Sequence, residues 1–148
     1  MGRRAIDPAL RHRVERRANG RCEYCGNPQL PKCVTFPVDH VIPVTRDGPT
    51  TFINLAFACP WCNASKGDAI AGYDRTTDQL VPLFNPRWGI WADHFRWSDN
   101  RLRIIGKTPT GRATVRRLRM NRRQAAIVRA FLLANGLHIT QQQVGEGK

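Results

Sequence analysis

Two cysteine pairs constrain the fold of this chain more than any other feature. Each pair has the spacing Cys-x-x-Cys, and the four residues are Cys22, Cys25, Cys59 and Cys62. This spacing lets one tight turn present two sulfurs to one ion, and four thiolates complete a closed tetrahedral zinc site. An iron–sulfur cluster and a redox dithiol are the competing interpretations. The pairs predict a structural zinc, whereas Cys33 is interpreted as a small thiol outside the site.

The balance of charge indicates a polyanionic partner. The chain has 148 residues, with 24 Lys and Arg against 11 Asp and Glu, and a formal net charge of +13. Clustered cations bind a phosphate backbone by releasing its counterions, so nucleic acid is favoured over simple solubility. No apolar run approaches the roughly 20 residues of a membrane-spanning helix, and the N-terminus lacks the apolar core of a signal peptide. We expect a cytoplasmic protein with one compact domain and flanking decoration.

Local signals predict a mixed α+β chain. Asp7 as a cap, Pro8 at the first helical position and Asn19-Gly20 as a stop predict a helix over residues 6–18. The other expected features are a proline-interrupted strand over 33–44, a short strand over 55–58, a helix from Pro60 to about Ala71, a hairpin of 95–97 with 102–105, a break at 108–111, a helix over 112–120, and a helix capped by Asn121 and ended by Asn135-Gly136.

Polar residues suited to phosphodiester chemistry lie between and beside the cysteine pairs. Asp39 offers a hard carboxylate ligand for an ion such as Mg²⁺, and His40 has a pKa suited to accepting a proton from water near neutral pH. Neighbours on a strand point to opposite faces, so both serve one site only if the strand is distorted, which the flanking prolines favour. Asn63 is either a helix cap or a neutral oxygen ligand to the same metal. Lys66 follows on the same helix face and is placed to hold a phosphate.

Together these residues resemble the HNH endonucleases, which have a ββα-metal fold. The resemblance rests on Cys22-x-x-Cys25, Asp39-His40, Asn54 and Cys59-x-x-Cys62-Asn63-x-x-Lys66. It implies that His40 is the general base for the attacking water and that Asn54 orients His40 through its backbone. It also implies that Asp39 ligates the catalytic divalent metal. Asn63 stands where many members have a second His, which resembles the HNN variant with Asn as a metal ligand.

The resemblance further implies the course of the reaction. The metal held by Asp39 and Asn63 stabilises charge on the phosphate and on the leaving oxygen, and cleavage leaves a 5′-phosphate and a 3′-hydroxyl. A hard, neutral Asn ligand favours Mg²⁺ or Mn²⁺ over a nitrogen-preferring metal. Lys66 and nearby arginines would add electrostatic stabilisation.

The region after Lys66 contains two further patterns. Asn85-Pro86-Arg87, Trp91-x-x-His94-Phe95 and Thr108-x-x-Gly111-Arg112-Ala113-Thr114 resemble the C-terminal region of small bacterial HNH proteins. Within it, His94 is interpreted as a hydrogen-bonded member of a packed aromatic cluster. From Arg101 to Gly145 there is no Asp or Glu but there are ten Lys or Arg. This indicates a DNA face, with an acidic protein as the alternative partner, and its candidate substrate-binding residues are Arg116, Arg117 and Arg119.

The predicted organisation is an N-terminal helix over residues 1–21, a nuclease core with zinc knuckles over 22–71 and a basic hairpin-plus-helices extension over 72–148. The function hypothesis is a metal-dependent endonuclease acting on DNA, with double-stranded DNA as the favoured substrate. The alternative is a non-catalytic, zinc-stabilised nucleic-acid-binding module. A protein-interaction zinc module would need a second zinc site. Only the nuclease requires the set Asp39, His40, Asn54 and Asn63.

Overall fold

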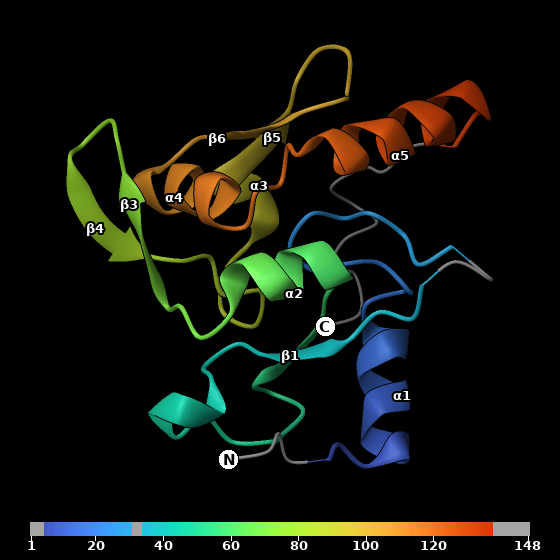
Figure 1. Ribbon diagram of the computed structural model, residues 1–148, viewed down its shortest axis with the longest axis vertical. Coiled ribbons are helices and arrows are strands. Elements are labelled where there is room, and N and C mark those ends of the chain that lie inside the picture. The colour runs from blue at the N-terminus through green and yellow to red at the C-terminus, as the bar shows by residue number, and fades with distance from the viewer. Residues whose placement is uncertain (1–4, 31–33, 138–148) are drawn as a thin grey trace.

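The computed structural model describes residues 5–30 and 34–137. Over these ranges, helices alternate with three two-stranded antiparallel sheets (Figure 1). This confirms the predicted α+β class. Cys33 lies outside the described residues. None of the helices in the described ranges is long and apolar enough to cross a membrane.

Helix α1, Pro8–Arg17, begins and ends at the predicted signals. Pro8 fits the start because its fixed φ suits a helix and its missing N–H is not needed there. Asn19 and Gly20 have positive φ angles of 56° and 67°, a left-handed conformation that stops the helix. The prediction that the Asp7 side chain caps the helix is wrong, since it makes no capping hydrogen bond within the described residues. Its carbonyl accepts the first helical bond instead.

Strands β1, Val38–His40, and β2, Leu55–Phe57, pair antiparallel, and helix α2, Pro60–Lys66, follows β2. The strand predicted over 33–44 is longer than β1, because the Ile42 N–H beyond His40 bonds the Asn54 side chain instead of a strand and Pro43 leads into the 3-10 turn Val44–Arg46. Helix α1 packs on β2, which is buried along its whole length. In Figure 1, α2 lies between β1 and helix α4.

Helix α2 is shorter than predicted. Gly67 follows it with a φ of 53°, which ends the helix at Lys66 rather than near Ala71. The chain then forms a hairpin of β3, Ala71–Asp74, and β4, Gln79–Pro82, which sequence reasoning did not predict. Apolar and polar residues do not alternate along these two strands, and the apolar Leu80 is 74% exposed. The period-2 pattern that marks a strand in a sequence is therefore weak here.

The C-terminal half continues with α3, Trp91–His94, and the hairpin of β5, Phe95–Trp97, with β6, Ile104–Gly106. That hairpin confirms the prediction, although its second strand begins two residues later and ends one residue later than predicted. Helix α4, Pro109–Arg117, begins inside the predicted break, because the Thr108 hydroxyl caps it by accepting from the Gly111 N–H at 2.9 Å.

Helix α5, Arg123–Ala134, is not capped by Asn121 as predicted. The Asn121 side chain instead pairs with Ile104, accepting from its N–H and donating to its carbonyl, both at 2.8 Å. The side chain thereby completes the hydrogen bonding of strand β6, and Arg122 takes the position before α5.

Close backbone contact joins α4 to the hairpin of β5 and β6, the second hairpin. A Cβ atom added to Gly111 would lie 2.0 Å from the His94 carbonyl oxygen, and one added to Gly106 would lie 2.4 Å from the Arg112 nitrogen. Only glycine permits such an approach. The aromatic residues Phe84, Trp91 and Phe95 pack beside this contact with ring centroids 5.0 to 5.2 Å apart.

An ion pair joins the hairpin of β3 and β4, the first hairpin, to α4. The Arg112 guanidinium donates to both oxygens of the buried Asp74 carboxylate, at 2.9 and 3.0 Å. Thr77 adds bonds from its N–H and hydroxyl. The Arg112 hydrogen bond, followed by those of Thr77, holds the pKa of Asp74 well below its usual value. The ionised form of Asp74 therefore belongs to the folded state.

We expect Asp74→Asn to lower the midpoint of thermal unfolding at pH 7 relative to the wild type. A folded-state pKa below the ordinary Asp value of about 3.9 means that the stabilisation is present above that value and is lost as pH falls below it. The difference in unfolding midpoint between the wild type and Asp74→Asn should therefore shrink below about pH 4. Asp78→Asn in the same hairpin turn is the control and should match the wild type. A gap that is equal at pH 3 and pH 7 would contradict this account.

Candidate metal centre and active site

The four cysteines of the two pairs converge in the folded chain. Their Sγ atoms all lie within 4.8 Å of one another, and all four residues are buried. The Sγ atoms of Cys25 and Cys59 are 3.8 Å apart. A tetrahedral zinc with Zn–S bonds of about 2.3 Å places its sulfurs about 3.8 Å apart. Both the donor chemistry and the spacing therefore fit a metal ion such as zinc.

Each knuckle holds its own sulfur by a backbone hydrogen bond. The Cys25 N–H points to the Cys22 Sγ at 3.5 Å, and the Cys62 N–H points to the Cys59 Sγ at 3.3 Å. The second bond also caps α2, because Cys59 is the residue before that helix. Arg122, just before α5, donates to the same Cys59 sulfur at 3.3 Å. Burial raises the pKa of the Cys22 thiol well above its usual value, whereas hydrogen bonds from the neighbouring thiols lower that of Cys25.

Glu23, between the first two cysteines, fastens this knuckle to β2. Its N–H donates to the Phe57 carbonyl at 2.8 Å, and its carboxylate accepts from the Phe57 N–H at 2.8 Å. Phe57 lies two residues before Cys59, so the clamp brings the two knuckles together. The two hydrogen bonds between Glu23 and Phe57 extend the pairing of β2 by one residue. Loss of the Glu23 carboxylate would leave the buried Phe57 N–H unpaired.

Asp39 is engaged on both sides of its carboxylate. It is 5% exposed, accepts from the Tyr24 hydroxyl at 2.7 Å and forms an ion pair with the Lys66 Nζ at 3.1 Å. The Lys66 Nζ also donates to the His40 carbonyl at 3.2 Å. Burial raises the pKa of Asp39, and the charge of Lys66 opposes that rise. Lys66 is itself buried, so this contact joins α2 directly to β1.

His40, the last residue of β1, takes a different partner. Its Nε2 lies 2.8 Å from the Thr50 hydroxyl. The ladder between β1 and β2 is regular at both Asp39 and His40, so the expected distortion does not lie within β1. The two side chains accordingly make separate contacts, Asp39 with α2 and the first knuckle, and His40 with the loop before β2.

Asn54 closes that loop at both ends. Its side-chain amide donates to the carbonyls of Ile42 and Pro49, at 3.0 and 2.8 Å, and accepts from the Ile42 N–H at 3.0 Å. Its carbonyl also accepts from the Val41 N–H. Asn54 therefore fixes the backbone that follows His40 and the residue that precedes Thr50, the partner of the His40 ring.

The loop is tight enough to require glycine at one position. A Cβ added to Gly48 would lie 1.7 Å from the Ile42 carbonyl oxygen, which is an impossible contact. The Gly48 N–H donates to the Pro43 carbonyl at 3.0 Å. Asp47 adopts a left-handed φ of 62° just before it. Loop shape and the Asn54 bonds together set the place of Thr50.

The remaining predicted site residues divide between α2 and α4. Asn63 is half-buried directly after Cys62, and its backbone N–H donates to Cys59 at the start of α2. Arg116, Arg117 and Arg119 are exposed at the end of α4 and just beyond it. Arg117 also donates to the Lys66 carbonyl at 3.4 Å, which places this arginine beside the end of α2.

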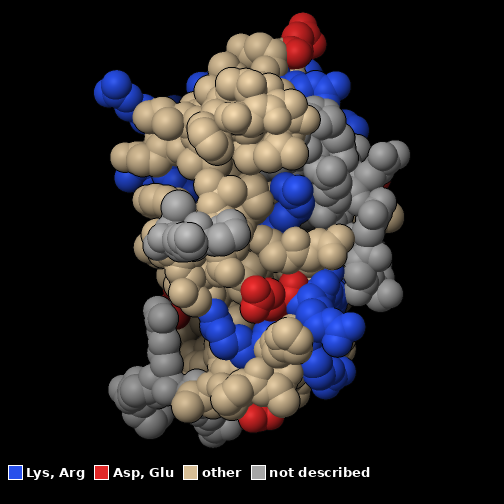
Figure 2. All heavy atoms as spheres, turned by 90° about the vertical axis from the view of Figure 1, so that its right-hand side faces the viewer, with Lys and Arg blue, Asp and Glu red and all other residues tan. Residues whose placement is uncertain are grey.

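Positive charge also gathers away from α4. Figure 2 shows Lys and Arg side chains grouped on the lower half of the face it presents, at the height where Figure 1 has α1. Helix α1 carries Arg11, Arg13, Arg16 and Arg17. Arg11 donates to the Phe36 carbonyl, and Arg17 is almost fully buried with 8% of its side chain exposed. Arg13 lies over the Phe52 ring, 4.4 Å from its centroid, so three of the four have structural contacts rather than a purely solvated role.

His94 makes the structural contacts expected of it. Its Nδ1 lies 2.6 Å from the hydroxyl of Thr108, which caps α4, and its ring packs against Phe84 with centroids 5.6 Å apart. Tyr24, Glu23 and Thr50 are the residues of this site that sequence reasoning missed. A Tyr or Glu between two ligand cysteines is a weak signal, and Thr50 gave none, because its contact depends on the loop geometry.

The comparisons with known proteins agree with this geometry. The family model described as HNH endonuclease matches residues 22–69, which run from the first cysteine to just beyond α2. No curated protein and no solved structure matched the chain. Residues 22–69, which hold the four-cysteine cluster, Asp39, His40 and Asn54, are the part of this chain that matches the HNH endonuclease family.

Proposed function

We propose that this protein is a metal-dependent endonuclease that hydrolyses phosphodiester bonds of DNA, preferably double-stranded. The proposal rests on one observation. The segment that matches the HNH endonuclease model is the segment in which the cysteine cluster and the contact between Lys66 and Asp39 hold α2 against β1. In this proposal β1, β2 and α2 form a ββα-metal core over residues 22–71, with 1–21 and 72–148 as flanking parts.

In the proposed mechanism His40 accepts a proton from water as the oxygen attacks the scissile phosphorus. The P–O bond to the 3′ oxygen breaks, which leaves a 5′-phosphate and a 3′-hydroxyl. A general base of this kind accelerates a reaction by about 10² to 10⁴-fold. The bond between the His40 Nε2 and Thr50 supports the assignment, because it fixes the ring plane. Asn54 acts indirectly, since it fixes the Pro49 carbonyl beside Thr50.

Asp39 and Asn63 are the proposed ligands of the catalytic Mg²⁺ or Mn²⁺. Because β1 is regular at Asp39 and ends at His40, the proposal brings the metal and the general base together at the end of the strand rather than through a distortion within it. Both offer hard oxygen atoms, which such ions prefer. When bound, the ion supplies charge stabilisation for the phosphate and the leaving oxygen. The Asp39 carboxylate already faces a cation, the Lys66 Nζ at 3.1 Å, so its environment suits positive charge. In this proposal Lys66 stays beside Asp39, where its charge would add electrostatic stabilisation to the phosphate.

The alternative is a non-catalytic, zinc-stabilised nucleic-acid-binding module. It explains the cysteine cluster and the charge but gives no purpose to the bond between His40 and Thr50 or to the loop that Asn54 closes. A binding module needs no ordered imidazole at the end of a buried strand. The match to an endonuclease family also favours catalysis.

Zinc at the cysteine cluster is tested by Cys59→Ser. This change removes one of four thiolates and the sulfur that caps α2, so we expect loss of bound zinc and a large fall in the unfolding midpoint. Zinc content is measured by elemental analysis and stability by thermal unfolding. Cys33→Ser is the matched control and should retain one zinc per chain. A stable Cys59→Ser protein with full zinc content would refute the assignment.

Catalysis by His40 is tested by plasmid nicking with added Mg²⁺ or Mn²⁺. We expect His40→Ala to nick at least about 100-fold more slowly than the wild type, because the proton acceptor is lost. His12→Ala, which removes an exposed histidine of α1, is the control and should nick at the wild-type rate. The catalytic proposal fails if the folded wild type leaves DNA intact with every metal, or if His40→Ala cuts equally well.

The role of the α4 arginines is tested by the salt dependence of DNA binding. Replacing Arg116, Arg117 and Arg119 together with Gln removes exposed charges without adding apolar surface. Each lost phosphate contact should reduce the slope of log affinity against log salt by about 0.9. Arg96→Gln, an exposed arginine on β5, serves as the single-site control. An unchanged slope in the triple variant would assign these arginines to a solvated surface.

A further inference from the structure

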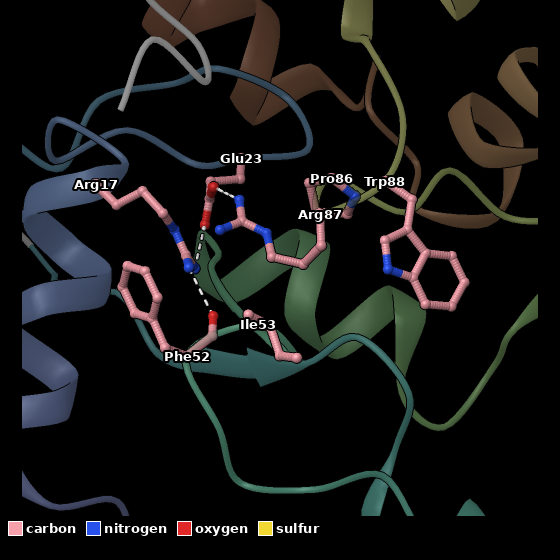
Figure 3. A pocket seen from close by; sticks show the side chains of 7 residues that line it. All are labelled: Arg17, Glu23, Phe52, Ile53, Pro86, Arg87 and Trp88. Atoms are coloured by element: carbon pink, nitrogen blue, oxygen red, sulfur yellow. Dashed lines mark hydrogen bonds and ion pairs between the residues drawn. The ribbon is translucent and has the colours of Figure 1, made fainter. Parts of the chain in front are cut away.

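A cavity of about 400 Å³ opens beside the loop that Asn54 closes. Residues lining it include Arg17, Glu23, Phe52, Ile53, Arg87 and Trp88 (Figure 3). They come from α1, the first knuckle, the segment just before Asn54 and the turn after β4. Its size lies in the range of small-molecule sites, roughly 300 to 1,000 Å³. The cleavage mechanism above makes no use of it.

Two buried guanidinium groups share one carboxylate in this cavity. The Arg87 Nη2 donates to the Glu23 Oε1, and the Arg17 Nη2 lies 3.7 Å from Oε2. Only 8% of the Arg17 side chain and 10% of the Arg87 side chain are exposed. The cavity therefore carries a net positive charge that its own carboxylate does not balance.

Arg17 also donates from Nη1 to the Phe52 carbonyl at 2.6 Å and from Nη2 to the Leu55 carbonyl at 2.5 Å, but the two arginines still have donors without acceptors. Within the described part of the chain, neither Nε–H of Arg17 or Arg87 has a hydrogen-bond partner. Both oxygens of Glu23 are occupied, and Oε2 is further used by the Phe57 N–H. Burial lowers the pKa of both arginines to about 10, as expected for charges that lack full compensation. An occupant that offers acceptor atoms would relieve this deficit.

The cavity also has exposed apolar residues on its walls. Trp88 is 77% exposed and Ile53 is 75% exposed, while Phe52 lies under the Arg17 guanidinium, 4.0 Å from it. The backbone that carries Trp88 is held in a turn, because the Asn85 carbonyl accepts from the N–H groups of Trp88 and Gly89 at 3.2 and 2.8 Å. A fixed backbone with an open indole face is a suitable platform for a flat ring.

We propose that this cavity receives one unstacked nucleobase of the DNA substrate, with the base stacked on Trp88 and its acceptor atoms directed to Arg17 and Arg87. Stacking on an exposed aromatic ring is the common way in which proteins hold unpaired bases, and arginine donors suit acceptor edges such as O6 and N7 of guanine. Ile53 directly precedes Asn54, so the occupant lies beside the loop that contacts His40. The choice of DNA as ligand rests on the proposed function.

The combination of charge and apolar surface favours a base over a bare phosphate. A phosphate would satisfy the arginines but would leave Trp88 and Ile53 exposed to water. A purely apolar ligand would cover these side chains but would leave the guanidinium donors buried without hydrogen bonds, which is unfavourable in free energy. A nucleobase offers both a flat apolar face and an edge with acceptors.

The test measures binding, so it does not depend on cleavage. The zinc-containing full chain is titrated, without added Mg²⁺ or Mn²⁺, against a fluorescein-labelled duplex that carries one bulged guanine. The comparison duplexes are fully paired or carry an abasic bulge. We expect the wild type to bind the guanine bulge about tenfold more tightly than either, and Trp88→Ala to lose this preference. Trp88→Phe should keep most of it, and Leu80→Ala, which truncates an equally exposed residue of β4, should keep all of it.

Each outcome decides the proposal separately from the nuclease function. If the wild type does not distinguish the guanine bulge from the abasic bulge, or if Trp88→Ala keeps the preference, the base subsite is refuted. A loss of preference in Leu80→Ala would also refute it, because the effect would not be specific to the cavity. If the preference depends on Trp88 while no metal supports nicking, the subsite stands and the nuclease proposal fails. If the wild type nicks DNA but shows no preference for the guanine bulge, the nuclease proposal stands and the base subsite is refuted.

Discussion

The burial of four thiols around one point is the interaction on which the rest of this structure depends. The sulfurs lie within 4.8 Å of one another and come from segments more than thirty residues apart in sequence. All four cysteines lie within the buried hydrophobic core, and their geometry fits thiolates that share one ion. Its closure fixes the turn between β2 and α2 against the first knuckle. The short strands alone, three residues each, would be marginal.

The two residues between the cysteines of the first knuckle contact two different parts of the structure. Between its cysteines, Tyr24 reaches Asp39 with its hydroxyl, whereas Glu23 reaches Arg17 and Arg87. The Tyr24 carbonyl also accepts from the Trp91 indole at 2.9 Å, which connects the knuckle to the C-terminal aromatic cluster. This one turn therefore supports the proposed catalytic carboxylate, the charged cavity and the packing of the second half of the chain. An ion bound by its cysteines would stabilise all three together.

Sequence reasoning predicted the features that depend on local chemistry. The cysteine cluster, the start and end of α1 and the second hairpin follow from spacing, proline and glycine signals that act within a few residues. The errors arose where a distant contact decides. Asn121 has the sequence of a cap, but Ile104, 17 residues away, takes its side chain. The buried contact of Lys66 with Asp39, 27 residues away, likewise has no local signal in the sequence.

The pair of Lys66 and Asp39 separates the roles of the two proposed metals. Removing one partner of a buried ion pair costs about 3 to 5 kcal/mol, so a bare Asp39 carboxylate would be a liability in a protein waiting for a catalytic ion. Lys66 balances that charge within the chain itself, at 3.1 Å. The fold therefore does not need the catalytic ion, whereas four thiolates would carry more negative charge than the two nearby cations, Arg122 and Arg129, could balance. Under the proposed function, the ion at the cysteine cluster would therefore serve structure, and the ion at Asp39 would serve catalysis alone.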